Sequence, residues 1–146
     1  MDALYSAYPD ASTALRVGSL QLRYINAIPF DFEWADVLQF LAEHLKITLA
    51  FSPALLTGMP VKAAPKGLNV VFEFSTENPA GALRVRLARG KRQDADALIL
   101  EMVLISEDAD APATPADFPA WLDAAHNVIH DTFFKMIEGR LEEQFR

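Results

Sequence analysis

The clearest pattern in the chain is an apolar periodicity over residues 116–145. Apolar side chains recur there at steps of three and four, including Trp121, Leu122, Ala125, Ile129, Phe133, Ile137 and Leu141. This spacing places them on one face of a helix, which at ~1.5 Å per residue would be ~45 Å long. Asp117 or Thr114 is expected to cap its start. Because such a stripe is unstable in water, the helix is expected to lie on another apolar layer.

Alternating apolar and polar positions predict that this other layer is a β-sheet. Strands are expected over residues 15–28, 68–76, 82–89 and 98–105. In the third of them, Leu83, Val85 and Leu87 alternate with Arg84 and Arg86. The fourth is apolar on both faces except at Glu101, which predicts a central position in the sheet.

The remaining segments predict two helices and the connections between the strands. Residues 32–46 are expected to form a helix that is capped by Asp31 and buries Trp34, Val37, Leu38, Leu41 and Leu45. Ser52 and Pro53 predict a brief helix that Gly58 ends. We expect loops at residues 90–95 and 106–115, and one or two helical turns at residues 2–8. A short strand at residues 61–63 is an open alternative to loop.

Together these elements predict a single α+β domain over residues 1–146. A mainly antiparallel sheet of about four to five strands would pack against the long C-terminal helix and the shorter helix after the first strand. The face of the sheet away from the helices would be polar. Its expected side chains are Gln21, Arg23, Glu73, Arg84, Arg86 and Glu101.

Composition and charge exclude several kinds of chemistry. The chain of 146 residues has a net charge of −7, which argues against general binding to nucleic acids or anionic membranes. It contains no cysteine, so disulfides and thiolate metal sites are excluded, and a reducing cytoplasm is the expected location. No apolar run is long enough for a membrane span, and the first residues do not resemble a secretion signal.

Two segments resemble a known family. The run Leu22-Arg23-Tyr24-Ile25-Asn26 is similar to the "LRYIN" strand of a sporadically distributed, uncharacterised prokaryotic family. The strand at residues 98–105, followed by an acidic loop and the helix that begins near Trp121, also resembles that family. The resemblance spans residues 16–145. Typical members carry a further N-terminal region, so the chain is expected to be a short member or a C-terminal piece. Because the family has no established activity, the resemblance implies a fold more than a function.

Two histidines on the last helix are the best candidates for metal binding or catalysis. His126 and His130 are four residues apart and would share a helical face, with Asp123 one turn earlier. Such a set could bind zinc, although a zinc-peptidase motif would need glutamate at Asn127. The alternative is that His126 lies at the edge of the buried stripe and His130 faces solvent beside Asp131. We favour this alternative and expect no metal or other cofactor.

Basic residues gather on one predicted hairpin. They are Arg84, Arg86, Arg89, Lys91 and Arg92, and Arg23 is expected nearby. This group could receive an anion, an acidic partner or RNA, or could simply be a solvated face offset by Glu73 and Glu101. Arg23, Tyr24, Asn26, Arg84 and Arg86 are the candidate ligand-binding residues, although Tyr24 and Asn26 also fit structural roles. No aromatic residue lies between the basic ones, so single-stranded nucleic acid is not expected.

These patterns favour a non-catalytic interaction or scaffold domain that self-associates or binds another protein. The second hypothesis is a small-molecule-binding domain with an apolar pocket between the sheet and the last helix. An enzyme of the hydrolase type that uses His126 and Asp123 is the third. The absence of glycine-rich phosphate loops, nucleophile motifs and paired carboxylates places catalysis last.

Overall fold

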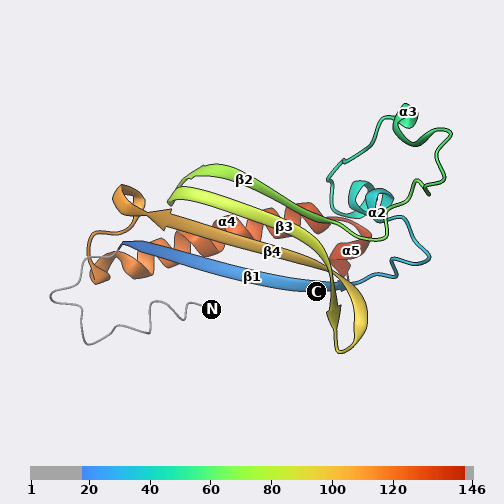
Figure 1. Cartoon of the computed structure of the whole chain (residues 1–146). Coiled ribbons are helices and arrows are strands. Elements are labelled where there is room, and N and C mark those ends of the chain that lie inside the picture. Colours follow the sequence, from blue (N-terminus) through green and yellow to red (C-terminus); the bar gives the residue numbers. More distant parts are fainter. Residues whose placement is uncertain (1–17, 144–146) are drawn as a thin grey trace.

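The computed structural model describes residues 18–143 as a four-stranded antiparallel sheet with one long helix packed on one of its faces. The elements are β1 (Ser19–Pro29), α2 (Val37–His44), α3 (Pro53–Leu56), β2 (Asn69–Glu77), β3 (Ala80–Arg92), β4 (Ala95–Glu107), α4 (Phe118–Ile137) and α5 (Arg140–Glu143). The strand order is β1-β4-β3-β2 (Figure 1). The predicted α+β class and the central position of β4 are therefore confirmed.

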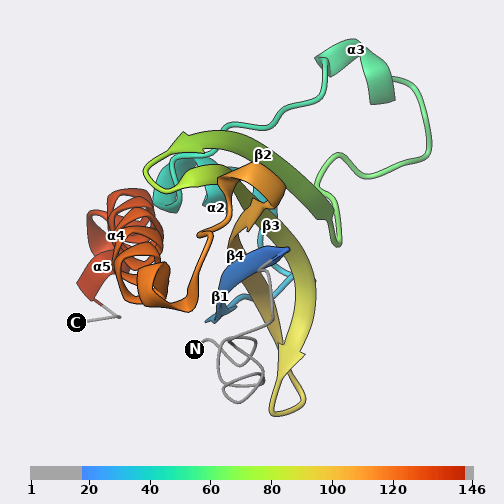
Figure 2. The same ribbon diagram turned by 90° about the vertical axis from the view of Figure 1, so that its left-hand side faces the viewer.

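The core lies between the sheet and α4. Leu22, Leu104 and Leu83 occupy one row across β1, β4 and β3, and Met102 and Val85 continue the same face one row further. These side chains are buried together with Trp121, Ala125, Ile129, Phe133 and Ile137 of α4. Figure 2 shows α4 on one side of the sheet, and no helix within residues 18–143 packs on the other side. We call that second side the outer face.

The hairpin between β3 and β4 is tighter than the sequence predicted. Pairing continues to Arg92 and Ala95, so the expected loop at residues 90–95 shrinks to Gln93 and Asp94. Both residues have positive φ, at 52° and 68°. Two consecutive positive values are typical of the type I′ turn, whose twist matches that of paired strands. The strands therefore extend beyond the apolar alternation by which sequence reasoning bounded them.

The helix predicted for residues 32–46 begins later than expected. Asp36, not Asp31, is its N-cap, because Asp36 Oδ1 accepts from the backbone N–H of Leu38 at 2.9 Å and of Gln39 at 3.4 Å. Asp31 instead closes a turn in which its backbone oxygen accepts from Trp34 N at 3.2 Å. The prediction that Trp34 is buried is therefore wrong: its side chain is 88% exposed, and Phe32 is buried instead.

The helix predicted for residues 116–145 is divided. Residues 115–117 form a 3-10 turn, and α4 ends at Ile137 because Glu138 has ψ 127° and Gly139 has φ 117°. The 20 residues of α4 span ~30 Å instead of ~45 Å. Asp117 occupies the expected N-cap position of α4, but neither Asp117 nor Thr114 makes a side-chain capping bond. The Thr114 hydroxyl donates to Asp117 Oδ2 at 3.2 Å instead.

A buried serine fastens α4 to the sheet. Trp121 Nε1 donates to Ser106 Oγ at 2.9 Å, and the Ser106 hydroxyl donates to the backbone oxygen of Ala80. The start of β3, the end of β4 and the first turn of α4 are thereby joined. The backbones of β3 and β4 approach each other closely here, so that a Cβ on Gly81 would lie 2.2 Å from the Ile105 carbonyl oxygen.

Residues 50–64, which we call the arm, form no strand. Residues 61–63 follow the loop alternative and not the short strand, while the brief helix after Ser52 is present as α3. Figure 1 places the arm beyond the end of the sheet where β2 begins, and Figure 2 places it on the outer-face side. The helical turns expected at residues 2–8 and the first part of the strand expected from residue 15 lie outside the described residues.

Candidate functional site

The outer face carries the charged rows that the sequence predicted. Arg23 Nε lies 3.1 Å from Glu101 Oε2, and Arg86 Nη1 lies 3.6 Å from Glu101 Oε1, so one carboxylate bridges β1 and β3. Arg84 Nη2 lies 3.1 Å from Glu73 Oε1 on β2. Arg84 and Arg86 face their glutamates directly in the register, and Arg23 reaches Glu101 diagonally, so these three arginines are all paired across adjacent strands.

Apolar side chains lie among these charges. Ile25 is the neighbour of Glu101 in the register, and Val71 is the neighbour of Arg86. Both side chains are more than half exposed, whereas Val103 in the centre of the face is 5% exposed. The outer face is thus a mixture of exposed aliphatic side chains and paired charges.

The structure separates the five candidate ligand-binding residues. Arg23, Arg84 and Arg86 share the outer face, but strand alternation turns Tyr24 and Asn26 toward α4. Tyr24 is half-buried against the core, and its ring contacts His126 edge-on with a centroid distance of 5.9 Å. The candidate residues therefore do not form one site around a common ligand.

The two histidines form a row of rings on the surface of α4. His126 stacks on His130 at a centroid distance of 5.7 Å, and His130 contacts Phe134 at 4.7 Å. His130 Nδ1 lies 3.4 Å from Asp131 Oδ1, as expected for the solvent-facing alternative. Within residues 18–143, Asp123 does not pair with either histidine, and no group of three potential metal ligands comes together.

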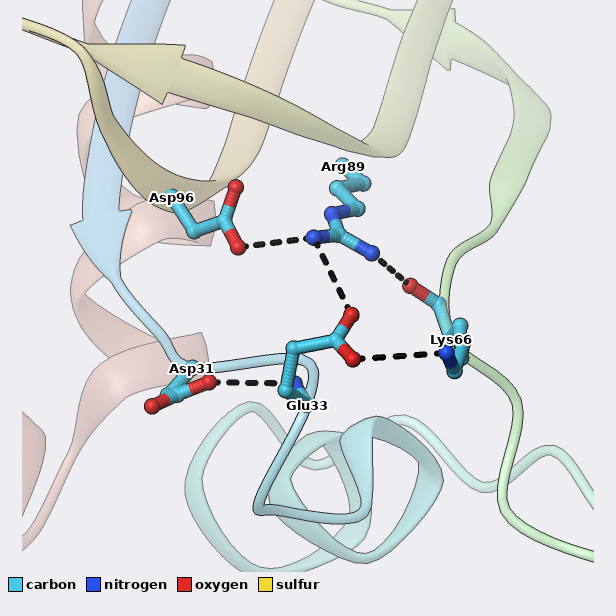
Figure 3. A network of polar contacts seen from close by, with 5 residues as sticks. All are labelled: Asp31, Glu33, Lys66, Arg89 and Asp96. Carbon is cyan, nitrogen blue, oxygen red and sulfur yellow. Dashed lines mark hydrogen bonds and ion pairs between the residues drawn. The ribbon is translucent and has the colours of Figure 1, made fainter.

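Arg89 is the centre of an ion-pair cluster that the sequence did not reveal (Figure 3). Its Nη2 lies 2.7 Å from Asp96 Oδ2 and 3.6 Å from Glu33 Oε2, and its Nη1 donates to the Lys66 carbonyl oxygen at 2.7 Å. Lys66 Nζ lies 3.3 Å from Glu33 Oε1. The guanidinium also covers the Phe32 ring at 5.0 Å. Arg89 therefore belongs to the base of the arm and not to an open basic hairpin.

The other end of the arm is held by Lys46. Its Nζ donates to the backbone oxygens of Met136 at 3.2 Å and Glu138 at 2.9 Å. These carbonyls belong to the last turn of α4, where a cation is favoured by the helix dipole. Ile47 and Leu49 pack on the core just beyond this contact. Both bases of the arm are thus fixed to the body of the domain.

The arm itself presents apolar side chains to solvent. Phe51, Leu55, Met59 and Val61 are each more than half exposed. Its hydrogen bonds are local: Leu55 N donates to Ser52 O at 2.9 Å, and Thr57 Oγ1 donates to Pro53 O at 2.6 Å. Sequence reasoning missed these exposed apolar side chains because a surface loop that contains a brief helix is expected to be polar. The missed signal is the absence of any charged residue from 47 to 61.

Two depressions on the surface of the described residues lie away from the space between the sheet and the middle of α4. One of ~390 Å³ is lined by Glu43, His44, Glu138, Gly139 and Leu141. The other, of ~510 Å³, is lined by Pro29, Phe30, Asp31, Ala95 and Asp96. Met102, Leu104 and Ile129 fill the space under α4 and are fully buried. The hypothesis of an apolar ligand pocket under α4 stays a prediction.

Among residues 18–143, no helix combines the length and the apolar character that a bilayer crossing requires. Comparison with family models, with curated proteins and with solved structures finds no match to this chain, so the resemblance to the LRYIN family stays an expectation.

Proposed function

We propose that this chain is a non-catalytic protein-interaction domain that forms a homodimer through the outer face of its sheet. The observation that carries the proposal is that this face spans all four strands, exposes Ile25 and Val71, and lacks a covering helix within the described residues. An antiparallel sheet packs its apolar face on a core and leaves the other face wet or available to a second layer.

The charge distribution favours a second copy at this face. The chain has a net charge of −7, so two copies repel each other over most of their surfaces. The outer face differs, because its arginines are paired with glutamates: Arg23 and Arg86 with Glu101, and Arg84 with Glu73. Two copies related by a two-fold axis could place arginines of one face beside glutamates of the other. Contact at this face therefore avoids the general repulsion.

The area of the face agrees with a modest interface. Four strands ~4.8 Å apart, with about nine residues each at ~3.3 Å per residue, present roughly 600 Å² per copy. Two stacked faces would bury about 1,200 Å², which is the lower end of the range for specific complexes. We therefore expect a dimer with a micromolar dissociation constant.

Sedimentation velocity between ~1 and ~100 µM tests the proposal. We expect the unmodified chain to pass from monomer to dimer, and Ile25→Lys to raise the dissociation constant by roughly tenfold or more, because it places a charge in the stacked layer. Lysine at this position can pair with Glu101 of its own chain, so the monomer should remain folded.

The matched control is Asn127→Lys, which adds the same charge on the exposed side of α4 and should leave the dissociation constant within about twofold. A chain that remains monomeric at ~100 µM, or a control that weakens the dimer as much as Ile25→Lys, would overturn the proposal.

A further inference from the structure

The arm has the properties of a contact surface and not of a solvent-exposed linker. Lys62 is its only charged residue, and it exposes Phe51, Leu55, Met59 and Val61. Loops at the surface are normally polar, and contiguous exposed apolar groups mark sites of interaction. If two copies met through their arms, each copy would remove the same four apolar side chains from water.

The arm is presented outward by two fixed bases. Lys46 holds one base against the carbonyl oxygens of Met136 and Glu138, and Arg89 holds the other through the Lys66 carbonyl. Between these bases, the chain does not fold back on its own core. The body of the domain therefore sets where the arm leaves the core and where it returns.

The arm lies on the same side of the sheet as the proposed dimer interface. Figure 2 shows it extending past β2 on the outer-face side, opposite to α4. A second copy stacked on the outer face would have the arm at the margin of the contact. The arm is thus continuous with that interface.

We infer that the arm clasps a second copy of this chain, with its apolar side chains packed against the partner's sheet at the edge of the proposed interface. The inference rests on the proposed function and deepens it. Two observations identify a second copy as the occupant. The nearly uncharged arm can approach a chain of net charge −7 without repulsion. The stacked faces alone also give an interface at the lower limit of area, and two arms would enlarge it.

The first test removes the apolar side chains of the arm. The triple variant Phe51→Ser, Leu55→Ser and Met59→Ser should weaken the dimer roughly tenfold to a hundredfold in sedimentation velocity. Its melting temperature at concentrations where the chain is monomeric should not change, because these side chains are exposed within one copy. The control is Phe74→Ser, which removes an exposed ring from the helix side of the sheet and should leave the dimer intact.

The second test follows the arm directly. The chain contains no cysteine, so Leu55→Cys can carry a single nitroxide label. The spectrum should show a mobile label in the Ile25→Lys monomer and a restrained label in the dimer. Asp94→Cys in the β3–β4 turn serves as the control and should stay mobile in both.

The outcomes separate the two proposals. A dimer that Ile25→Lys disrupts, but that the triple arm variant leaves intact with a mobile label at residue 55, would overturn the clasp and leave the proposed function standing. A chain that stays monomeric would overturn both. If vesicles of phosphatidylcholine and phosphatidylglycerol, and not a second copy, restrain the label, a lipid surface is the occupant and the clasp is wrong.

Discussion

At the scale of single residues, Ser106 connects more elements than its size suggests. Among the described residues, Ser106 is the only polar one that is fully buried. Its hydroxyl joins α4 to the start of β3, next to the β2–β3 turn. A hydroxyl both donates and accepts, so one small side chain satisfies the Trp121 indole and the Ala80 carbonyl at once. The serine therefore fixes where α4 begins to cross the sheet.

Replacement of Ser106 by alanine should cost about 1–3 kcal/mol of unfolding free energy, because a buried indole N–H and a buried carbonyl lose their partner. Urea denaturation followed by circular dichroism measures the loss. Ser75→Ala, at an exposed position of β2, is the control and should change stability by less than about 0.5 kcal/mol. Equal stability of the two variants would contradict the role given to Ser106.

Sequence patterns do not distinguish some residues that local geometry separates. Asp31 and Asp36 both precede apolar residues and both fit an N-cap, and only the backbone shows that Asp36 begins α2. The same ambiguity explains why Trp34 was wrongly predicted to be buried, since it lies on the apolar stripe only if the helix starts at residue 32. Arg89 was grouped with Arg84 and Arg86 by sequence proximity, yet it points to Glu33 and Asp96 because strand alternation places it with Leu87.

At the scale of elements, the strands were the most predictable part of the fold. Leu83, Val85 and Leu87 alternate with arginines because one face is dry and the other wet, and this period does not depend on distant partners. The ends of the elements were less predictable. The type I′ turn at Gln93 and Asp94 and the end of α4 at Gly139 depend on dihedral angles that apolar periodicity does not encode.

Because the body is packed and the arm is extended, the same substitution should change the unfolding free energy by different amounts in the two parts. Leu41 of α2 is fully buried, whereas Leu55 of α3 is more than half exposed. Leu41→Ala should lower the unfolding free energy by about 2–5 kcal/mol because it leaves a cavity in the core. Leu55→Ala should lower it by less than about 0.5 kcal/mol in the monomer. Chemical denaturation at low micromolar concentration compares the two, and a large loss in Leu55→Ala would show that the arm packs on its own chain.

At the scale of the whole molecule, the net charge of the chain contrasts with the paired charges of the proposed interface. Two copies with a charge of −7 repel at long range, while the arginines of the outer faces are paired with glutamates. Long-range repulsion is screened once the Debye length is short, and it falls from ~30 Å at ~10 mM salt to ~8 Å at ~150 mM. Contacts between neighbouring charges are screened less.

Dimer formation should therefore strengthen as salt rises from ~10 to ~150 mM, because screening removes the repulsion between the two acidic bodies. Sedimentation equilibrium at both salt concentrations measures the change. Sucrose at matched viscosity controls for effects other than ionic strength. A steady weakening over this range would instead show that attraction between opposite charges dominates the contact.

The candidate site could be predicted only in part. The sequence indicated that Arg23, Glu73, Arg84, Arg86 and Glu101 share a face, because each lies at the polar position of its strand. Which arginine meets which glutamate depends on strand order, and Glu101 bridges Arg23 and Arg86 only because β4 lies between β1 and β3. The arm was not predicted, since exposure of Phe51 or Leu55 depends on where both of its bases are attached.

The strand order also has a consequence for how the chain is made. β1 is synthesised first among the strands but pairs only with β4, the last, so that Ser19 meets Glu107. On the ribosome, the nascent β1 must wait unpaired while β2, β3 and β4 emerge and form their local hairpins. Non-local pairing of this kind slows folding. We therefore expect protection of β1 amides to be the last event of vectorial folding, after the rest of the sheet has assembled.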